Sequence, residues 1–219
     1  IPAGRLIGLL GPSGCGKSTA LNLICGLLKP TEGKIFFGED DVTGLPPENR
    51  GVGMVFQNYA LYPHLTVEKN IQFPLENLKG ADKLSKEEMS KRVLEAAKLV
   101  QIDHLLERKP NELSGGQQQR ISIARAILKD APIVVFDEAT SYSDIENEHK
   151  IQLALQNLLR GKTTIMIAHR LHTIRNADNI VVFQDGKVAE QGTHDELIAR
   201  GSTYSHMWDT YTRETIGEE

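Results

Sequence analysis

The chain has 219 residues, with 25 lysines and arginines against 29 aspartates and glutamates, and 40% of its residues are hydrophobic. The net charge of −4 argues against a general nucleic-acid binder, which normally carries a strong basic excess. No apolar run approaches the roughly 18 residues of a membrane-spanning helix, and no signal-peptide pattern opens the chain, so we expect neither. Cys15 and Cys25 are too few for a disulfide framework and predict a reducing cytosol.

The first part of the chain alternates short apolar runs with helical patterns. In chain order these predict a strand at 5–10, a helix at 19–28, strands at 35–37 and 52–56, and helices at 66–73, 85–100 and 115–129. Thr66 is expected to cap its helix, and Ser85 with Glu88 has the spacing of a capping box. Because 66–129 lacks a clear strand, we interpret it as a helical insertion.

The second part predicts a strand at 133–136, a helix at 146–160, a strand at 164–168, a hairpin of 180–184 with 187–190, and helices at 193–200 and 203–211. The apolar run 133–136 suits a central parallel strand that is buried on both faces. The hairpin is expected because Asp185-Gly186 is a strong two-residue turn signal. Strands that alternate with helices predict an α/β fold with a mainly parallel sheet.

A glycine-rich loop lies between the first expected strand and helix. Its sequence, from Gly11 to Ser18, fits the pattern G-x4-G-K-[ST]. Glycines let the backbone curl so that N–H groups point into one concavity, where phosphate oxygens bind beside a helix N-terminus. Lys17 adds a positive charge for the β- and γ-phosphates, and Ser18 offers a hydroxyl to Mg²⁺. The predicted nucleotide-binding residues are Gly11, Ser13, Gly14, Cys15, Gly16, Lys17, Ser18 and Thr19. The alternative is a chance glycine-rich turn, which the strand–helix context disfavours.

Two carboxylates follow the apolar run 133–136. Ligands of open α/β sheets bind at the carboxyl ends of strands, so Asp137 is a candidate for the Mg²⁺ shell. Glu138 is then the candidate that polarises an attacking water. The alternative is that Asp137 only caps the next turn, and the neighbouring phosphate loop makes this interpretation weaker.

The pentapeptide Leu113-Ser-Gly-Gly-Gln117 precedes the helix at 115–129. With it the chain resembles the ATP-binding cassette (ABC) ATPases, and the resemblance covers nearly the whole chain. The order of motifs also matches that family: phosphate loop, Gln57, signature, acidic strand end, Asp144 and His169. The resemblance implies one P-loop NTPase domain over 1–219, with a RecA-like core at 1–65 and 130–219 and a helical subdomain at about 66–129.

The resemblance also implies the chemistry. ATP and Mg²⁺ would bind, and ATP would be hydrolysed in a head-to-tail homo- or heterodimer coupled to membrane-spanning transporter subunits at the cytoplasmic face, without nucleic acid. The implied catalytic residues are Lys17, Gln57, Glu138 and His169, and the implied metal ligands are Ser18, Gln57 and Asp137. The residues implied to meet the ATP or the surface of the partner subunit are Ser114, Gly115, Gly116, Gln117 and Asp144.

Three departures from the family pattern matter. The chain opens just before the first strand, so the N-terminal antiparallel strands and their adenine-stacking aromatic residue are expected to be truncated, with a weaker grip on adenine. Ser141-Tyr-Ser-Asp144 replaces the usual Ser-Ala-Leu-Asp and puts packing at the subunit contact in question. The third departure is that the two halves resemble different branches, and the importer's C-terminal regulatory domain is expected to be absent.

The two halves resemble different branches. Residues 1–130 look like a bacterial sugar-importer ATPase, on the sequence from Met54 to Pro63. Residues 139–215 look like a bacterial exporter, on Ala168-His-Arg-Leu171 and the sequence from Glu190 to Glu196. These resemblances favour a recombined or engineered splice of two cassettes over one natural cassette of mixed character.

Other functions remain open on the sequence alone. The departures also fit a nucleotide-binding module with little or no turnover. DNA-repair and translation-factor relatives are less favoured, because the chain has neither a long heptad run nor a second phosphate loop.

Overall fold

The computed structural model of the chain describes residues 1–56, 58–76, 78, 83–137, 151, 153–155, 158–168 and 171–216, with backbone alone at 214–216. The chain divides into two compact units: residues 1–52 together with 163–219, and residues 53–162. No helix in the described part is both long and apolar enough to cross a membrane.

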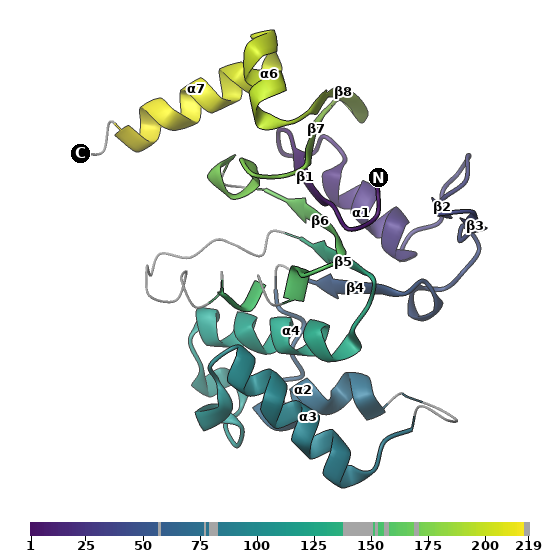
Figure 1. Cartoon of the computed structure of the whole chain (residues 1–219), viewed down its shortest axis with the longest axis vertical. Coiled ribbons are helices and arrows are strands. Elements are labelled where there is room, and N and C mark those ends of the chain that lie inside the picture. The colour runs from purple at the N-terminus through teal and green to yellow at the C-terminus, as the bar shows by residue number, and fades with distance from the viewer. Residues whose placement is uncertain are drawn as a thin grey trace. The chain divides into compact units, whose positions relative to one another are not determined.

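The first unit is built around β1 (Leu6–Leu10), which lies between β6 (Thr163–Ile167) and β7 (Asn179–Gln184) and runs parallel to both (Figure 1). β8 (Lys187–Gly192) pairs with β7 in the antiparallel direction, which gives the order β6-β1-β7-β8. Ile7, Leu9 and Leu10 of β1 are buried, as expected of a strand covered on both faces. The expected strands and hairpin are thereby confirmed. The hairpin turns through Asp185 and Gly186, whose φ angles are 50° and 75°.

Helix α1 (Lys17–Cys25) begins two residues before the expected start at 19 and ends three before the expected end at 28. Gly16 and Gly26 flank it with φ angles of 104° and 81°. Left-handed backbone is cheapest at glycine, so these two residues, and not the apolar pattern, set the helix limits. Lys17 and Ser18 therefore lie in the first turn of the helix and not in the loop.

Arg50 closes the carboxyl end of α1. Its side chain is only 5% exposed and donates to the carbonyl oxygens of Leu23 and Ile24, at 2.6 and 3.0 Å. It also donates to the carbonyls of Thr43 and Leu45, at 3.0 and 2.9 Å. A buried guanidinium is tolerated here because carbonyl oxygens accept its hydrogen bonds.

The remaining elements of the first unit lie at its periphery. A two-stranded antiparallel ribbon pairs β2 (Phe36–Phe37) with β3 (Asp40–Asp41), and sequence patterns indicated only the first of these. β3 consists of aspartates, which are depleted in strands, so its pairing has no compositional signal. Helix α6 (His194–Arg200) has Thr193 as its N-cap, and α7 (Thr203–Ile216) extends past the expected end at 211.

The second unit contains β4 (Val52–Val55) apart from its first residue, β5 (Ile133–Phe136) and the helices of the expected insertion. The helices are α2 (Val67–Glu76), α3 (Lys86–Leu99) and α4 (Gly115–Lys129) (Figure 1). Both α2 and α3 pack against α4. Residues 151, 153–155 and 158–159 are helical, within the expected helix at 146–160.

Local signals correctly predicted the helix starts in this unit. Thr66 accepts a hydrogen bond from the Lys69 amide at 3.3 Å, and Ser85 accepts one from the Glu88 amide at 3.1 Å. Helix α2 continues three residues beyond the expected end at 73, through Pro74. Pro74 removes one backbone hydrogen bond from the helix, which ends two residues later at Glu76. Between the expected helices at 85–100 and 115–129, a short 3-10 helix forms at Pro110–Glu112.

Candidate functional site

The glycine-rich loop joins the end of β1 to the start of α1, as the sequence predicted. Gly11, Gly14 and Gly16 have φ angles of 146°, 78° and 104°. Such angles are costly for residues with a Cβ, so this backbone path requires glycine at these positions. The loop thereby turns tightly and leads directly into a helix N-terminus.

The carboxyl end of β7 packs against this loop. A Cβ atom added to Gly11 would lie 2.4 Å from the Phe183 carbonyl oxygen and 2.7 Å from Cys15 Sγ. A Cβ added to Gly16 would lie 3.8 Å from the Gly186 Cα, in the hairpin turn. The loop therefore packs closely against residues that come much later in the sequence, and no motif indicated this contact.

Lys17 folds back over its own loop. Its Nζ donates to the carbonyl oxygens of Gly11 at 2.7 Å and Pro12 at 2.9 Å. Ser18 and Thr19 are exposed, and the first turn of α1 has no acidic residue. Free N–H groups and the positive end of the helix dipole make such a turn suitable for an anion.

The signature residues form the start of α4. Ser114 is the N-cap: its Oγ accepts from the Gln117 amide at 3.4 Å, while its own amide donates to Gln117 Oε1 at 2.9 Å. This reciprocal pair is a capping box, and it fixes the entry of the helix. Ser114 and Gly115 are exposed and Gly116 is buried. The amino end of α4 is therefore exposed to solvent, and its first turn has no acidic residue. Like the amino end of α1, it is suited to bind an anion.

Polar residues are buried in the next turns of α4. Arg120 is 4% exposed and donates to the carbonyls of Val100 and Gln101, at 3.3 and 3.1 Å. Gln119 is fully buried, and within the described residues neither of its amide atoms has a hydrogen-bond partner. A buried amide without a partner is costly, so Gln119 is a local weakness of α4.

Asp137 directly follows β5 and is half-buried. Its amide donates to the Val55 carbonyl at 3.0 Å, which fixes the backbone at the strand end. Four further residues of the predicted site, namely Gln57, Glu138, Asp144 and His169, lie outside the described residues. Among those that the structure describes, no group of three or more histidine, cysteine, aspartate or glutamate side chains forms a metal cluster.

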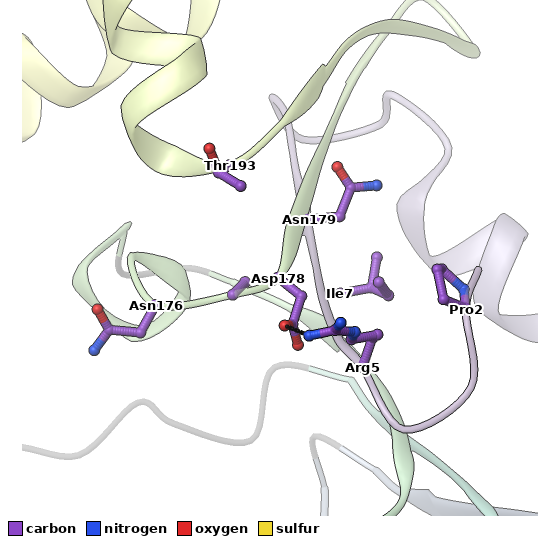
Figure 2. A pocket seen from close by; sticks show the side chains of 8 residues that line it. Pro2, Arg5, Ile7, Asn176, Asp178, Asn179 and Thr193 are labelled. Carbon is purple, nitrogen blue, oxygen red and sulfur yellow. Dashed lines mark hydrogen bonds and ion pairs between the residues drawn. The ribbon is translucent and has the colours of Figure 1, made fainter.

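A cavity of about 530 Å³ lies elsewhere in the first unit (Figure 2). Two of its lining residues, Arg5 and Asp178, form an ion pair at 2.7 Å. Hydrogen bonds from the Leu6 amide and then from Arg5 hold the pKa of the Asp178 carboxyl below its usual value. The cavity is lined by Pro2, Arg5, Ile7, Asn176, Ala177, Asp178, Asn179 and Thr193. Because it is at the amino ends of β1 and β7, it lies at the sheet edge opposite the glycine-rich loop and is a separate feature.

Comparison with known proteins decides the family. The family model described as ABC transporter matches residues 1–141. The chain belongs to the ABC transporter family. An sn-glycerol-3-phosphate import ATP-binding protein, UgpC, from Rhizobium meliloti (strain 1021) is 41% identical over 206 residues, which cover 93% of this chain and 58% of that protein. The maltose/maltodextrin import ATP-binding protein MalK of Salmonella typhimurium (strain LT2) is 44% identical over 197 residues, covering 89% and 52%.

Solved structures of the ABC family have the same fold. An ATP-bound bacterial Atm1-family ABC exporter superimposes with a TM-score of 0.80 at 34% identity, covering 96% of this chain and 37% of that one. The cassette MJ0796, in a dimeric post-hydrolysis state with ADP and Pi, has a TM-score of 0.79 at 37% identity, covering 89% and 87%. The expected P-loop NTPase fold with a mainly parallel sheet is therefore confirmed.

The cassette is only part of most of these proteins. It spans just over half the length of the curated relatives that it matches. Importers and an exporter both match along most of the chain. Because these identities are measured over the whole alignment, the spliced origin of the two halves stays a prediction, as do the domain limits at 65 and 130.

Proposed function

We propose that this chain binds ATP and hydrolyses it with Mg²⁺ as the nucleotide-binding domain of an ABC transporter. The observation that carries the proposal is the loop of Gly11, Gly14 and Gly16, which leads into the amino end of α1 beside Lys17. Support also comes from the relatives, which are import ATP-binding proteins, and from the neighbour MJ0796, which holds ADP and Pi.

In this proposal the loop amides and the first turn of α1 bind the phosphates. Lys17 exchanges the carbonyl oxygens of Gly11 and Pro12 for β- and γ-phosphate oxygens. A phosphate oxygen carries more negative charge than a carbonyl oxygen, so this exchange is favourable. The exposure of Ser18 and Thr19 leaves their hydroxyls and amides available.

Mg²⁺ would be held by oxygen ligands. Ser18 offers an exposed hydroxyl, Asp137 a half-buried carboxylate at a strand end, and Gln57 an amide oxygen. This donor set fits a small hard cation, which when bound neutralises charge on the β- and γ-phosphate oxygens. Glu138 orders the attacking water and His169 contacts the γ-phosphate, so catalysis is chiefly positioning and electrostatic stabilisation.

The complete site requires two copies of the cassette. Ser114, Gly115, Gly116 and Gln117, at the exposed amino end of α4, would bind the ATP held by the partner, and Asp144 would contact the partner's surface. MJ0796 is dimeric, which supports this arrangement. Membrane-spanning transporter subunits would be the further partners, with the cassette at the cytoplasmic face of the membrane.

The test is phosphate release from Mg²⁺-ATP at a series of protein concentrations. Activity should rise faster than linearly with protein, because paired subunits complete each site. Glu138→Gln should bind ATP with unchanged affinity and release phosphate at least about a hundredfold more slowly. Binding without release by the unaltered chain would favour a nucleotide-binding module, and no binding at millimolar ATP would reject the proposal.

A further inference from the structure

The segment that follows Gln57 has an unusual backbone. Tyr59 and Ala60 have φ angles of 60° and 46°, in the left-handed region that residues with a Cβ rarely adopt. A local bond supports this conformation, since the Ala60 amide donates to Asn58 Oδ1 at 3.3 Å. Strained backbone of this kind persists where the surrounding structure holds it in place.

Helix α2 holds the later part of the segment through Asn70. This side chain is fully buried, and its Oδ1 accepts from the Tyr62 amide at 2.8 Å. Its Nδ2 lies within 3.0 to 3.2 Å of the carbonyl oxygens of Tyr62, Leu65 and Thr66. These contacts satisfy the backbone polar groups of the segment where it joins α2.

Helix α4 holds the strained part through Arg125. The guanidinium donates from Nη1 to the Ala60 carbonyl oxygen at 2.6 Å. The same group lies over the Tyr62 ring, with Cζ 5.2 Å from the ring centroid. Desolvation lowers the pKa of Arg125, and the neighbouring Tyr62 opposes that change. One planar group from α4 therefore contacts both ends of the turn from Ala60 to Tyr62.

We propose that Arg125 is a positioning residue that couples the signature helix α4 to the segment carrying Gln57. The start of α4 and residues 58–62 would then shift together when the subunits close on ATP. This inference rests on the proposed function, in which Ser114 meets the partner's nucleotide and Gln57 acts at the metal. Arginine is required because a planar guanidinium can donate to a carbonyl and stack on a ring at once, whereas a lysine ammonium is a compact point charge.

The first experiment is hydrogen exchange of the unliganded protein, which does not depend on activity. In Arg125→Lys the amides of Tyr59 and Tyr62 should exchange about tenfold faster, while the amides of α1 keep their rates. The matched control is Arg92→Lys on α3, where the arginine bonds to Glu88 at 3.1 Å on the exposed helix surface. Unchanged exchange at 58–62 in Arg125→Lys, or the same change in Arg92→Lys, would overturn the proposal.

The second experiment separates coupling from nucleotide binding. Arg125→Lys should lower kcat about tenfold and leave the affinity for ATP unchanged, because the glycine-rich loop proposed to bind the phosphates belongs to the other compact unit of the chain. A parallel loss of affinity and kcat, or an unchanged kcat in an active protein, would contradict the coupling. If the unaltered chain releases no phosphate, the proposed function fails, and the exchange experiment still decides whether Arg125 holds the segment.

A second variant keeps the proposal testable if Arg125→Lys does not fold. Tyr62→Leu removes the ring beneath the guanidinium and keeps the bond from Arg125 to Ala60. It should speed exchange at Tyr59 by about threefold, and the double variant should add nothing beyond Arg125→Lys alone. Additive effects of the two substitutions would mean that the residues act separately, against the proposal.

Discussion

The Nζ atom of Lys17 donates a hydrogen bond to the carbonyl oxygen of Gly11 at 2.7 Å, across the turn of the glycine-rich loop. The lysine thus bonds to the first residue of its own loop, and the Pro12 carbonyl at 2.9 Å is its second partner. These neutral acceptors hold the ammonium over the loop while leaving it able to move to a more strongly charged oxygen.

Replacing Lys17 should abolish turnover with little effect on folding. In Lys17→Met we expect phosphate release from Mg²⁺-ATP to fall at least about a hundredfold, because a charge that stabilises the transition state is lost. The free energy of unfolding should change by less than about 1 kcal/mol, since water can replace the lysine at a half-exposed site. Lys29→Met, at an exposed residue beyond the end of α1, is the matched control and should keep full activity. Equal turnover in both variants would contradict the assigned role.

Alanine at two glycines of the same loop should have unequal effects. In Gly11→Ala the new Cβ would lie 2.4 Å from the Phe183 carbonyl oxygen, whereas at Gly14 it would have nothing within 4 Å. Both positions have positive φ, so an alanine at either one would strain the backbone. We expect the free energy of unfolding in urea to fall by about 3 kcal/mol for Gly11→Ala and by about 1 kcal/mol for Gly14→Ala. Equal losses would show that packing against β7 adds nothing.

Removing the unpartnered amide in α4 should stabilise the protein. In Gln119→Leu we expect the free energy of unfolding to rise by about 1–2 kcal/mol, because a buried polar group without a partner is replaced by an apolar one of similar size. The control is its neighbour, Gln118→Leu, which loses hydrogen bonds to the carbonyls of Pro110 and Leu113, at 2.9 and 3.2 Å. The free energy of unfolding of Gln118→Leu should fall by about 1 kcal/mol. A destabilised Gln119→Leu would mean that the amide has a partner in solution.

The stability of the first unit should depend on alkaline pH through Tyr204. Burial raises the pKa of Tyr204 to about 12, from the 10.0 of an exposed tyrosine. The raised pKa means that the folded state keeps the proton longer than the unfolded state. The contribution of protonated Tyr204 to the free energy of unfolding is therefore complete below about pH 10 and is lost as the pH rises toward 12.

Urea unfolding at a series of alkaline pH values measures this effect. In Tyr204→Phe the fall in unfolding free energy above pH 10 should be shallower than in the unaltered protein, although the bond to His194 at 2.8 Å is lost at every pH. Tyr211→Phe also breaks a tyrosine–histidine pair, with His172 at 2.6 Å, and leaves Tyr204 in place. It should keep the steeper decline, and identical slopes for the two variants would refute the assignment.

Short sequence patterns were enough to predict those parts of the fold whose interactions are local. The start of α4 follows from Ser114 and Gln117, which bond to each other's backbone within one turn. The β7–β8 hairpin likewise follows from Asp185-Gly186, where two adjacent residues supply the positive φ angles. In both cases the partners are at most a few residues apart, so a short pattern contains all the atoms that decide the structure.

Contacts between residues that are far apart in the sequence could be seen only in the folded chain. The Phe183 carbonyl excludes any side chain at Gly11, Arg50 holds the last carbonyls of α1, and Arg125 reaches Ala60. The carbonyl that accepts such a bond has the same chemistry in every residue, so no sequence pattern marks it. Which of them becomes a partner depends on the packing of strands and helices that are far apart in the chain, and that packing is a property of the whole fold.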